Sequence, residues 1–135
     1  MQDNFSRSNY KVLRGLHYQT DPQQGKLVTC LNGEIFDVCV DLRKSSSTYG
    51  QHISINLRGD EPSCLWIPPG FAHGFCVLSQ NGADVMYKVD SAYNPKTEGC
   101  ILWNAANLGV SWPIQDPILS EKDAKGFTSY EGIEL

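Results

Sequence analysis

The stretch LRGLHYQ, from Leu13 to Gln19, places an imidazole, that of His17, in the middle of a strand-like segment. Side chains alternate between the two faces of a strand, so we expect His17 on one face with Leu13, Gly15 and Gln19, and Arg14 on the other. A glycine inside a strand often marks the close approach of a ligand or another backbone. We therefore expect His17 to look into a cavity, where an imidazole can act as a general base or acid. A hydrogen-bonded structural histidine is the simpler alternative.

Two opposite charges, Lys26 and Asp37, lie in neighbouring strand-like runs, KLVTCL and EIFDVCVDL. The Asn32-Gly33 pair between these runs is typical of a two-residue hairpin turn, which predicts that they pair directly. In that register, Lys26 and Asp37 are diagonal neighbours on one mostly apolar face. An exposed ion pair and a polar pair inside a binding cavity both fit this pattern.

Three further side chains could carry chemistry. Tyr87 lies in a strand-like run between Val85 and Val89, where a core aromatic is the simpler interpretation. Asp123 follows Ser120 at the spacing of a capping box, which predicts a helix start near the C-terminus. His73 begins a strand-like run directly after a Pro-Pro-Gly turn.

The elements that must position these residues are short strands separated by turns. With 12 glycines and 7 prolines, strand-like runs recur every ten residues or so, and only the C-terminal end looks helical. We expect one all-β domain over residues 1–135, a jelly-roll barrel with a ligand in its mouth and a short C-terminal helix.

Composition excludes several classes of partner. The net charge of −4 gives no field for nucleic acid or for an anionic membrane surface. No run of eighteen apolar residues and no signal-peptide pattern is present, so we expect a cytoplasmic protein without membrane contact. The five cysteines form no CxxC pair, which favours free thiols in a reducing compartment over disulfides or zinc.

The segment IPPGFAHGF resembles the PxGxxH element of the cupins, with His73 as its histidine. Metal-binding cupins add an HxH pair and a carboxylate on an earlier strand, but the matching run here, GEIFDVCVD, has no histidine. A single histidine is too few ligands for a metal. We therefore expect no metal and no other cofactor, and a metal-dependent cupin is a disfavoured alternative.

Eight short motifs in order resemble the dTDP-4-dehydrorhamnose 3,5-epimerase family of cupin-like barrels. They are LRGLHYQ, QGKLV, NGEIFDV, IPPGFAHGF, MYK, YNP, ILWN and LSEKD, and together they cover nearly the whole chain. The resemblance implies a metal-free isomerase, cytoplasmic and homodimeric, that acts on a dTDP-linked 4-keto-6-deoxyhexose in rhamnose or O-antigen biosynthesis.

The resemblance also implies a role for each candidate residue. His17 is the base, oriented by Asp123, while Tyr87 is the acid on the opposite face of the sugar and Lys26 stabilises the enolate. The implied substrate-binding residues are Arg14 at the diphosphate, Gln2 and Asn4 at the nucleotide base, His73 and Asp37 beside the sugar, and Tyr93 near the base or sugar.

The family normally carries several dozen residues before QDN, including a strand exchanged between subunits, and we expect this N-terminal segment to be absent here. Its absence keeps open a non-catalytic nucleotide-sugar binding module as an alternative. A single-centre epimerase and a ketoisomerase of the same substrate class also remain, because the sequence does not determine how the ring turns in the pocket.

Overall fold

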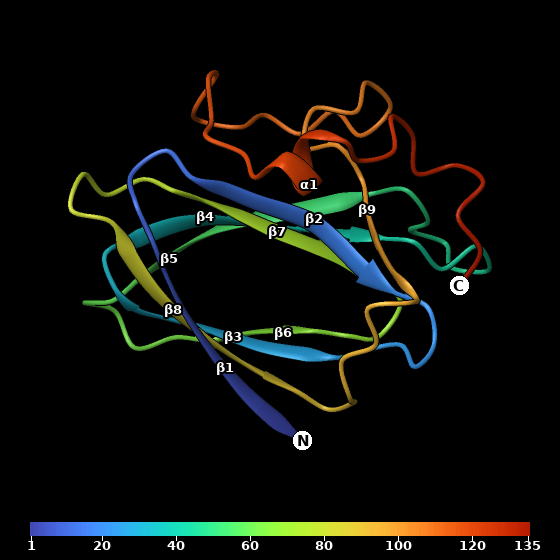
Figure 1. The fold of residues 1–135 in the computed structure, drawn as a ribbon, viewed down its shortest axis with the longest axis horizontal. Helices are drawn as coiled ribbons and strands as arrows, with labels where there is room; N and C mark the ends of the chain where they lie inside the picture. Colours follow the sequence, from blue (N-terminus) through green and yellow to red (C-terminus); the bar gives the residue numbers. More distant parts are fainter.

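The computed structural model describes residues 1–135 as two antiparallel sheets that pack face to face (Figure 1). The strands and helix are β1 (Gln2–Ser8), β2 (Leu13–Gln19), β3 (Lys26–Asn32), β4 (Glu34–Asp41), β5 (His52–Arg58), β6 (Leu65–Ile67), β7 (Phe71–Val77), β8 (Ala83–Val89), β9 (Glu98–Cys100) and α1 (Glu121–Ala124). One sheet has the order β1-β8-β3-β6 and the other β5-β4-β7-β2-β9. This architecture confirms the expected all-β, cupin-like fold with a short C-terminal helix.

The predicted hairpin between β3 and β4 is wrong, because the two strands belong to different sheets. Gly33 supplies the positive φ of +82° that the connection needs, but the chain crosses there from one layer to the other. Strand β3 pairs with β8 and β6, and β4 pairs with β5 and β7 along its length. Lys26 and Asp37 therefore face the same interior from opposite layers and are not neighbours within one sheet.

Apolar residues fill only part of the space between the sheets. Alternation groups Val28, Cys30, Ile35 and Cys39 on the face that carries Lys26 and Asp37, and the structure places that face inward, where these four residues belong to one buried cluster. A second cluster lies on the outer face of the five-stranded sheet, where Leu16, Val38 and other residues pack under the C-terminal segment. Near β1 and β2 the two sheets separate, and polar side chains line the space between them.

Strand β2 departs from the strict alternation that the sequence predicts. Its pairing with β7 shifts register between Arg14 and His17, and Leu16 instead exchanges backbone hydrogen bonds with Ile101. A bulge changes the face to which the following side chains point. As a result Arg14 and His17 line the same cavity, whereas Leu16 is fully buried on the other side.

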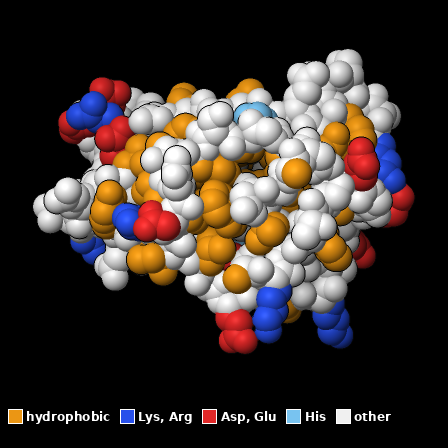
Figure 2. Space-filling model, turned by 90° about the horizontal axis from the view of Figure 1, so that it is seen from above, with side chains coloured by type: hydrophobic (Ala, Val, Ile, Leu, Met, Phe, Trp, Pro, Cys, Tyr) orange, Lys and Arg blue, Asp and Glu red, His pale blue; other side chains and the backbone are white.

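The segment after β9 covers the outer face of the five-stranded sheet. Seen from above, the molecule shows apolar side chains gathered along its middle, with most charged groups at its edges and one oppositely charged pair among the apolar side chains (Figure 2). Trp103 and Trp112 line a cavity of about 360 Å³ there, and they meet edge to face. None of the helices is long and apolar enough to cross a membrane.

Asp41, at the end of β4, anchors the connection to β5. Its buried carboxylate accepts hydrogen bonds from the Arg43 backbone amide (2.9 Å) and guanidinium, from Ser46 Oγ (2.6 Å) and from Thr48 Oγ1 (2.5 Å). Burial alone would raise the pKa of Asp41, but these donors outweigh it and hold that pKa well below its ordinary value.

We predict that Asp41→Asn lowers the free energy of unfolding at neutral pH by about 2–4 kcal/mol, because it removes a charge that satisfies several buried donors. A depressed carboxyl pKa stabilises the fold above the unfolded-state pKa of about 4 and loses that stabilisation as the pH falls. Urea unfolding at pH 7 and pH 3 should therefore show a variant whose deficit shrinks in acid. Asp60→Asn, at an exposed partner of Arg58, is the matched control and should change stability by less than about 0.5 kcal/mol.

Candidate functional site

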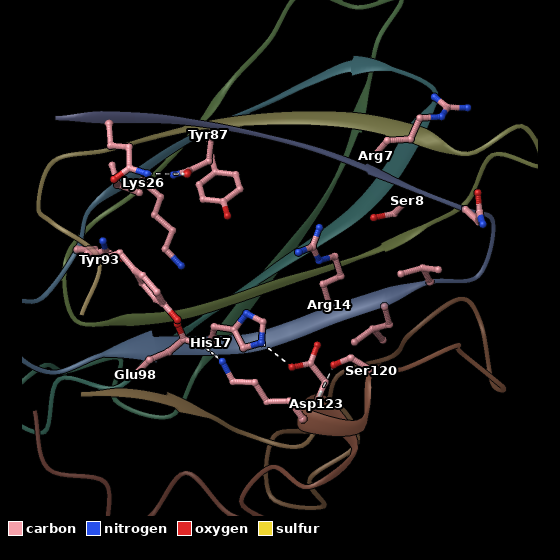
Figure 3. Close-up of a pocket in the computed structure, with 18 residues that line it drawn as sticks. Arg7, Ser8, Arg14, His17, Lys26, Tyr87, Tyr93, Glu98, Ser120 and Asp123 are labelled. Carbon is pink, nitrogen blue, oxygen red and sulfur yellow. Dashed lines mark hydrogen bonds and ion pairs between the residues drawn. The ribbon is translucent and has the colours of Figure 1, made fainter. Parts of the chain in front are cut away.

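A cavity of about 690 Å³ opens where the two sheets separate, between β1 and β2 (Figure 3). Its size falls within the range of small-molecule sites. Eight of the ten residues singled out from the sequence line it: Gln2, Asn4, Arg14, His17, Lys26, Tyr87, Tyr93 and Asp123. They come from β1, β2, β3, β8, the β8–β9 connection and α1, so the fold gathers residues from the whole length of the chain.

His17 and Asp123 form a hydrogen-bonded pair on one wall of the cavity. His17 Nε2 lies 2.6 Å from Asp123 Oδ1, and the two side chains face each other in Figure 3. Because an ionised carboxylate only accepts hydrogen bonds, it selects the tautomer that carries its proton on Nε2. The lone pair of Nδ1 is then free, which gives the imidazole the form that a general base requires.

Asp123 is held in place from three sides. Its other oxygen, Oδ2, accepts a hydrogen bond from the Gly15 amide at 3.2 Å, and Cys100 Sγ lies 3.8 Å from Oδ1. Burial opposes ionisation of Asp123, but the hydrogen bond from His17 outweighs it and lowers the pKa of the carboxyl. The same environment raises the pKa of the Cys100 thiol to about 12, mainly through burial, so this thiol is neutral.

The predicted helix start at Ser120 is confirmed, but only half of a capping box forms. Ser120 Oγ accepts a hydrogen bond from the Asp123 amide at 3.1 Å. In a full box the acid reaches back to the cap amide, whereas here its carboxylate binds His17 and Gly15. The short helix therefore sets the position of Asp123 and leaves its side chain for the site.

The opposite wall carries Lys26 and Tyr87. They lie on adjacent strands of the four-stranded sheet, where Val28 on β3 pairs with Tyr87 on β8. In Figure 3 the Lys26 amine and the Tyr87 hydroxyl both extend into the space that His17 faces from the other sheet. A flat ligand between the walls would meet a base on one side and a phenol on the other, which is the arrangement that proton exchange across a ring requires.

The cavity carries more cationic than anionic groups at its surface. Its two internal salt bridges join His17 to Asp123 and Lys122 to Glu98, which leaves Arg14 and Lys26 without a carboxylate partner. Burial lowers the pKa of Lys26, against the opposing fields of Glu98 and Asp37. Two unpaired cations in one pocket indicate an anionic ligand.

His73 and Asp37 are not among the residues that line this cavity, and their place beside the sugar stays a prediction. Both are buried, and His73 Nε2 lies 2.8 Å from Asp37 Oδ2. His73 pairs with His17 across β2 and β7, so both imidazoles lie on the inner face of the five-stranded sheet, and the buried His73–Asp37 pair faces the interior between the two sheets. Asp37 Oδ1 has no hydrogen-bond partner within the chain.

Sequence reasoning missed several lining residues, among them Arg7, Gln24, Glu98 and Lys122. Lys122 precedes Asp123 on the helix and bonds to Glu98 at the start of β9. That contact spans 24 residues and depends on the pairing of β9 with β2, which no local motif predicts. The position of Lys122 beside Asp123 was the only available signal.

Two loops that bear Gln24 and Tyr93 are joined by Gln19. Its buried amide donates to the Pro22 carbonyl at 2.6 Å and to the Ala92 carbonyl at 3.0 Å, and it accepts from the Asn94 amide at 2.9 Å. One side chain at the end of β2 thus sets the position of both loops at that end of the cavity.

Comparisons with known proteins agree with this geometry. Residues 1–130 match the family described as dTDP-4-dehydrorhamnose 3,5-epimerase. Over 127 residues the chain is 52% identical to the dTDP-4-dehydrorhamnose 3,5-epimerase of Shigella flexneri, covering 93% of this chain and 70% of that protein.

Two solved structures show the same fold. The dTDP-6-deoxy-D-glucose-3,5-epimerase of Legionella pneumophila, in complex with dTDP-4-keto-L-rhamnose, is 49% identical with a TM-score of 0.90, over 94% of this chain and 68% of that one. A 3′-monoepimerase of Streptomyces bikiniensis, in complex with dTDP-quinovose, is 30% identical with a TM-score of 0.86, over 93% of this chain and 64% of that one.

We predict that the Lys26 amine titrates at lower pH than the amine of N-acetyl-lysine amide, because burial disfavours its charged form. Competitive labelling with acetic anhydride across a pH series, read by mass spectrometry, measures the midpoint for each lysine separately. Lys122, whose pKa the Glu98 carboxylate raises, is the internal control and should titrate above the reference. A Lys26 midpoint at or above that of free lysine would show that the amine is solvated or tightly paired.

Proposed function

The chain belongs to the dTDP-4-dehydrorhamnose 3,5-epimerase family, and we propose that it inverts C3 and C5 of a dTDP-linked 4-keto-6-deoxyhexose in deoxysugar biosynthesis. The observation that carries this proposal is the placement of a carboxylate-bound imidazole on one sheet and a phenol with an unpaired lysine on the other. Epimerisation needs proton transfer on both faces of one ring, and the two walls provide it.

The proposed reaction starts with proton removal by His17. The C4 ketone acidifies the hydrogens at C3 and C5, and Nδ1 of His17 accepts one of them from the face that it approaches. Asp123 stabilises the imidazolium that forms, through the hydrogen bond to Nε2. Negative charge moves to the C4 oxygen, where the Lys26 ammonium stabilises the enolate in a partly dry cavity.

Reprotonation from the opposite face completes the inversion, and Tyr87 is the proposed acid. The remaining lining residues serve binding. Arg14 suits the diphosphate because its guanidinium is unpaired and matches phosphate oxygens. Gln2 and Asn4 on β1 reach the nucleotide base, and Tyr93 borders the base or sugar. His73 and Asp37, on the inner face of the same sheet as His17, lie beside the sugar in this proposal.

The first experiment is proton NMR of dTDP-4-keto-6-deoxyglucose in heavy water with the purified, metal-free protein. We expect loss of both the C3 and C5 signals, since each deprotonation admits deuterium from solvent. His17→Ala and Asp123→Asn should each slow both exchanges by about 100- to 10,000-fold, because each removes the competent base. Loss of only one signal would identify a single-centre enzyme, such as the 3′-monoepimerase of Streptomyces bikiniensis.

Tyr87→Phe is the contrasting variant in the same assay. It should retain measurable exchange at C3 while slowing the accumulation of inverted product, because the base remains and only the opposite-face acid is lost. His52→Ala is a matched control, since His52 lies on β5 and does not line the cavity. Full exchange with the His17→Ala variant would show that His17 is not the base. No exchange with the native protein would favour the non-catalytic binding module.

We also propose that two copies form a homodimer through the outer face of the four-stranded sheet. Nothing in the chain covers this face, which lies below the sandwich in Figure 1. Phe5, Leu31 and Trp66 are exposed there, and Phe5 is flanked by the ion pairs Asp3–Lys88 and Arg7–Asp84. An apolar centre with charges of both signs around it can match a second copy of itself.

Sedimentation equilibrium tests this assembly. The native chain should sediment as a dimer, and Phe5→Glu with Trp66→Glu should yield a folded monomer, because each copy would bury two unpaired carboxylates. Ile118→Glu, an exposed apolar residue outside this sheet, is the control and should leave the dimer intact. A monomeric native chain would contradict the proposal.

The place of action that we propose is the cytoplasm. All five cysteines are free thiols, and four of them are buried. Unpaired buried thiols are typical of proteins in a reducing compartment.

A further inference from the structure

Cys100 lies beside the His17–Asp123 pair and has no part in the proposed reaction. The ligand atoms of His17, Cys100 and Asp123 all lie within 4.8 Å of one another. The Cys100 sulfur is 3.8 Å from Asp123 Oδ1, which itself is 2.6 Å from His17 Nε2. An imidazole nitrogen, a thiol and a carboxylate are the three ligand types that zinc uses in proteins.

The surroundings supply what a metal would further need. His17 is about one quarter exposed and lies on the cavity surface, so an ion can enter from the solvent. Asp123 and Cys100 are buried, so the Asp123 carboxylate is poorly solvated, and a Cys100 thiolate would form only with a cation beside it. Shifts of less than about 1 Å would bring the three atoms to zinc-ligand distances, with the fourth position open to cavity water.

We propose that His17, Cys100 and Asp123 form an inhibitory zinc site within the catalytic cavity. Zinc forms bonds to His17 Nε2, Asp123 Oδ1 and Cys100 Sγ. The thiol proton leaves to solvent, and the imidazole proton moves from Nε2 to Nδ1 by exchange with water. One thiolate and one carboxylate neutralise the two charges of the ion.

Inhibition follows from the change of tautomer, and this part rests on the role proposed for His17. With zinc on Nε2, Nδ1 carries the proton and can no longer accept one from the sugar. The cation also removes Asp123 as the partner of the imidazole. Zinc therefore inhibits the proposed epimerisation, whose steps require no metal.

The absorption spectrum of bound cobalt(II) tests the site without a measurement of activity. Titration of the metal-free protein under nitrogen should give one equivalent of bound cobalt, with a thiolate-to-cobalt charge-transfer band and strong visible bands of a four-coordinate ion. Cys100→Ala should lose the charge-transfer band, while Cys64→Ala, which removes the exposed thiol, should keep it. Absence of the band in the native protein, or its persistence in Cys100→Ala, would overturn the proposal.

Zinc inhibition gives the second readout, with each protein normalised to its own metal-free rate. Zinc should inhibit the native protein reversibly, with recovery after addition of EDTA. In Cys100→Ala the zinc concentration for half inhibition should rise at least about tenfold. Cys100→Ser should behave in the same way and replaces the alanine variant if that one fails to fold. Equal zinc sensitivity in all variants would place the inhibitory ion elsewhere, and an inactive metal-free protein would count against the proposed function alone.

Discussion

The hydrogen bond between His17 and Asp123 joins residues 106 positions apart and is the contact on which the site depends. It joins strand β2 to the C-terminal helix α1. It also selects the tautomer in which Nδ1 of His17 is free to accept a proton. Gly15 contributes through its amide, and its lack of a side chain lets β2 approach β7, where a Cβ would lie 2.6 Å from Gly74 Cα. The position of the His17 imidazole thus depends on how β2, β7 and α1 pack against one another.

Much of the site could be predicted because the chemistry lies in residue types at recognisable positions. Alternation predicted which side chains of β3 and β4 share a face, since successive side chains of a strand point to opposite faces. The start of the helix followed from Ser120, whose side chain caps an amide regardless of tertiary structure. Alternation did not decide whether Lys26 faces a cavity or the solvent, and the pairing of β3 with β8 in one sheet is what brings Lys26 and Tyr87 together.

The remaining features depended on long-range pairing. The Asn32-Gly33 turn satisfies local rules for a hairpin, but β3 and β4 gain more from full ladders with β8 and β7 than from each other. The bulge in β2 is equally invisible in LRGLHYQ, because it arises where one strand must pair with both β7 and β9. The partnership of Glu98 and Lys122 and the depth of His73 follow from those same pairings.

Strand β1 contributes Gln2 and Asn4 to the cavity, yet it hydrogen-bonds to a strand on one side only, β8. A strand with one neighbour shares fewer backbone hydrogen bonds with its sheet than a central strand such as β8 does. The wall assigned to nucleotide recognition therefore depends on a single ladder, the one between β1 and β8. A ligand that contacts Gln2 and Asn4 adds a second set of contacts to this strand, so its occupancy protects the β1 amides from hydrogen exchange.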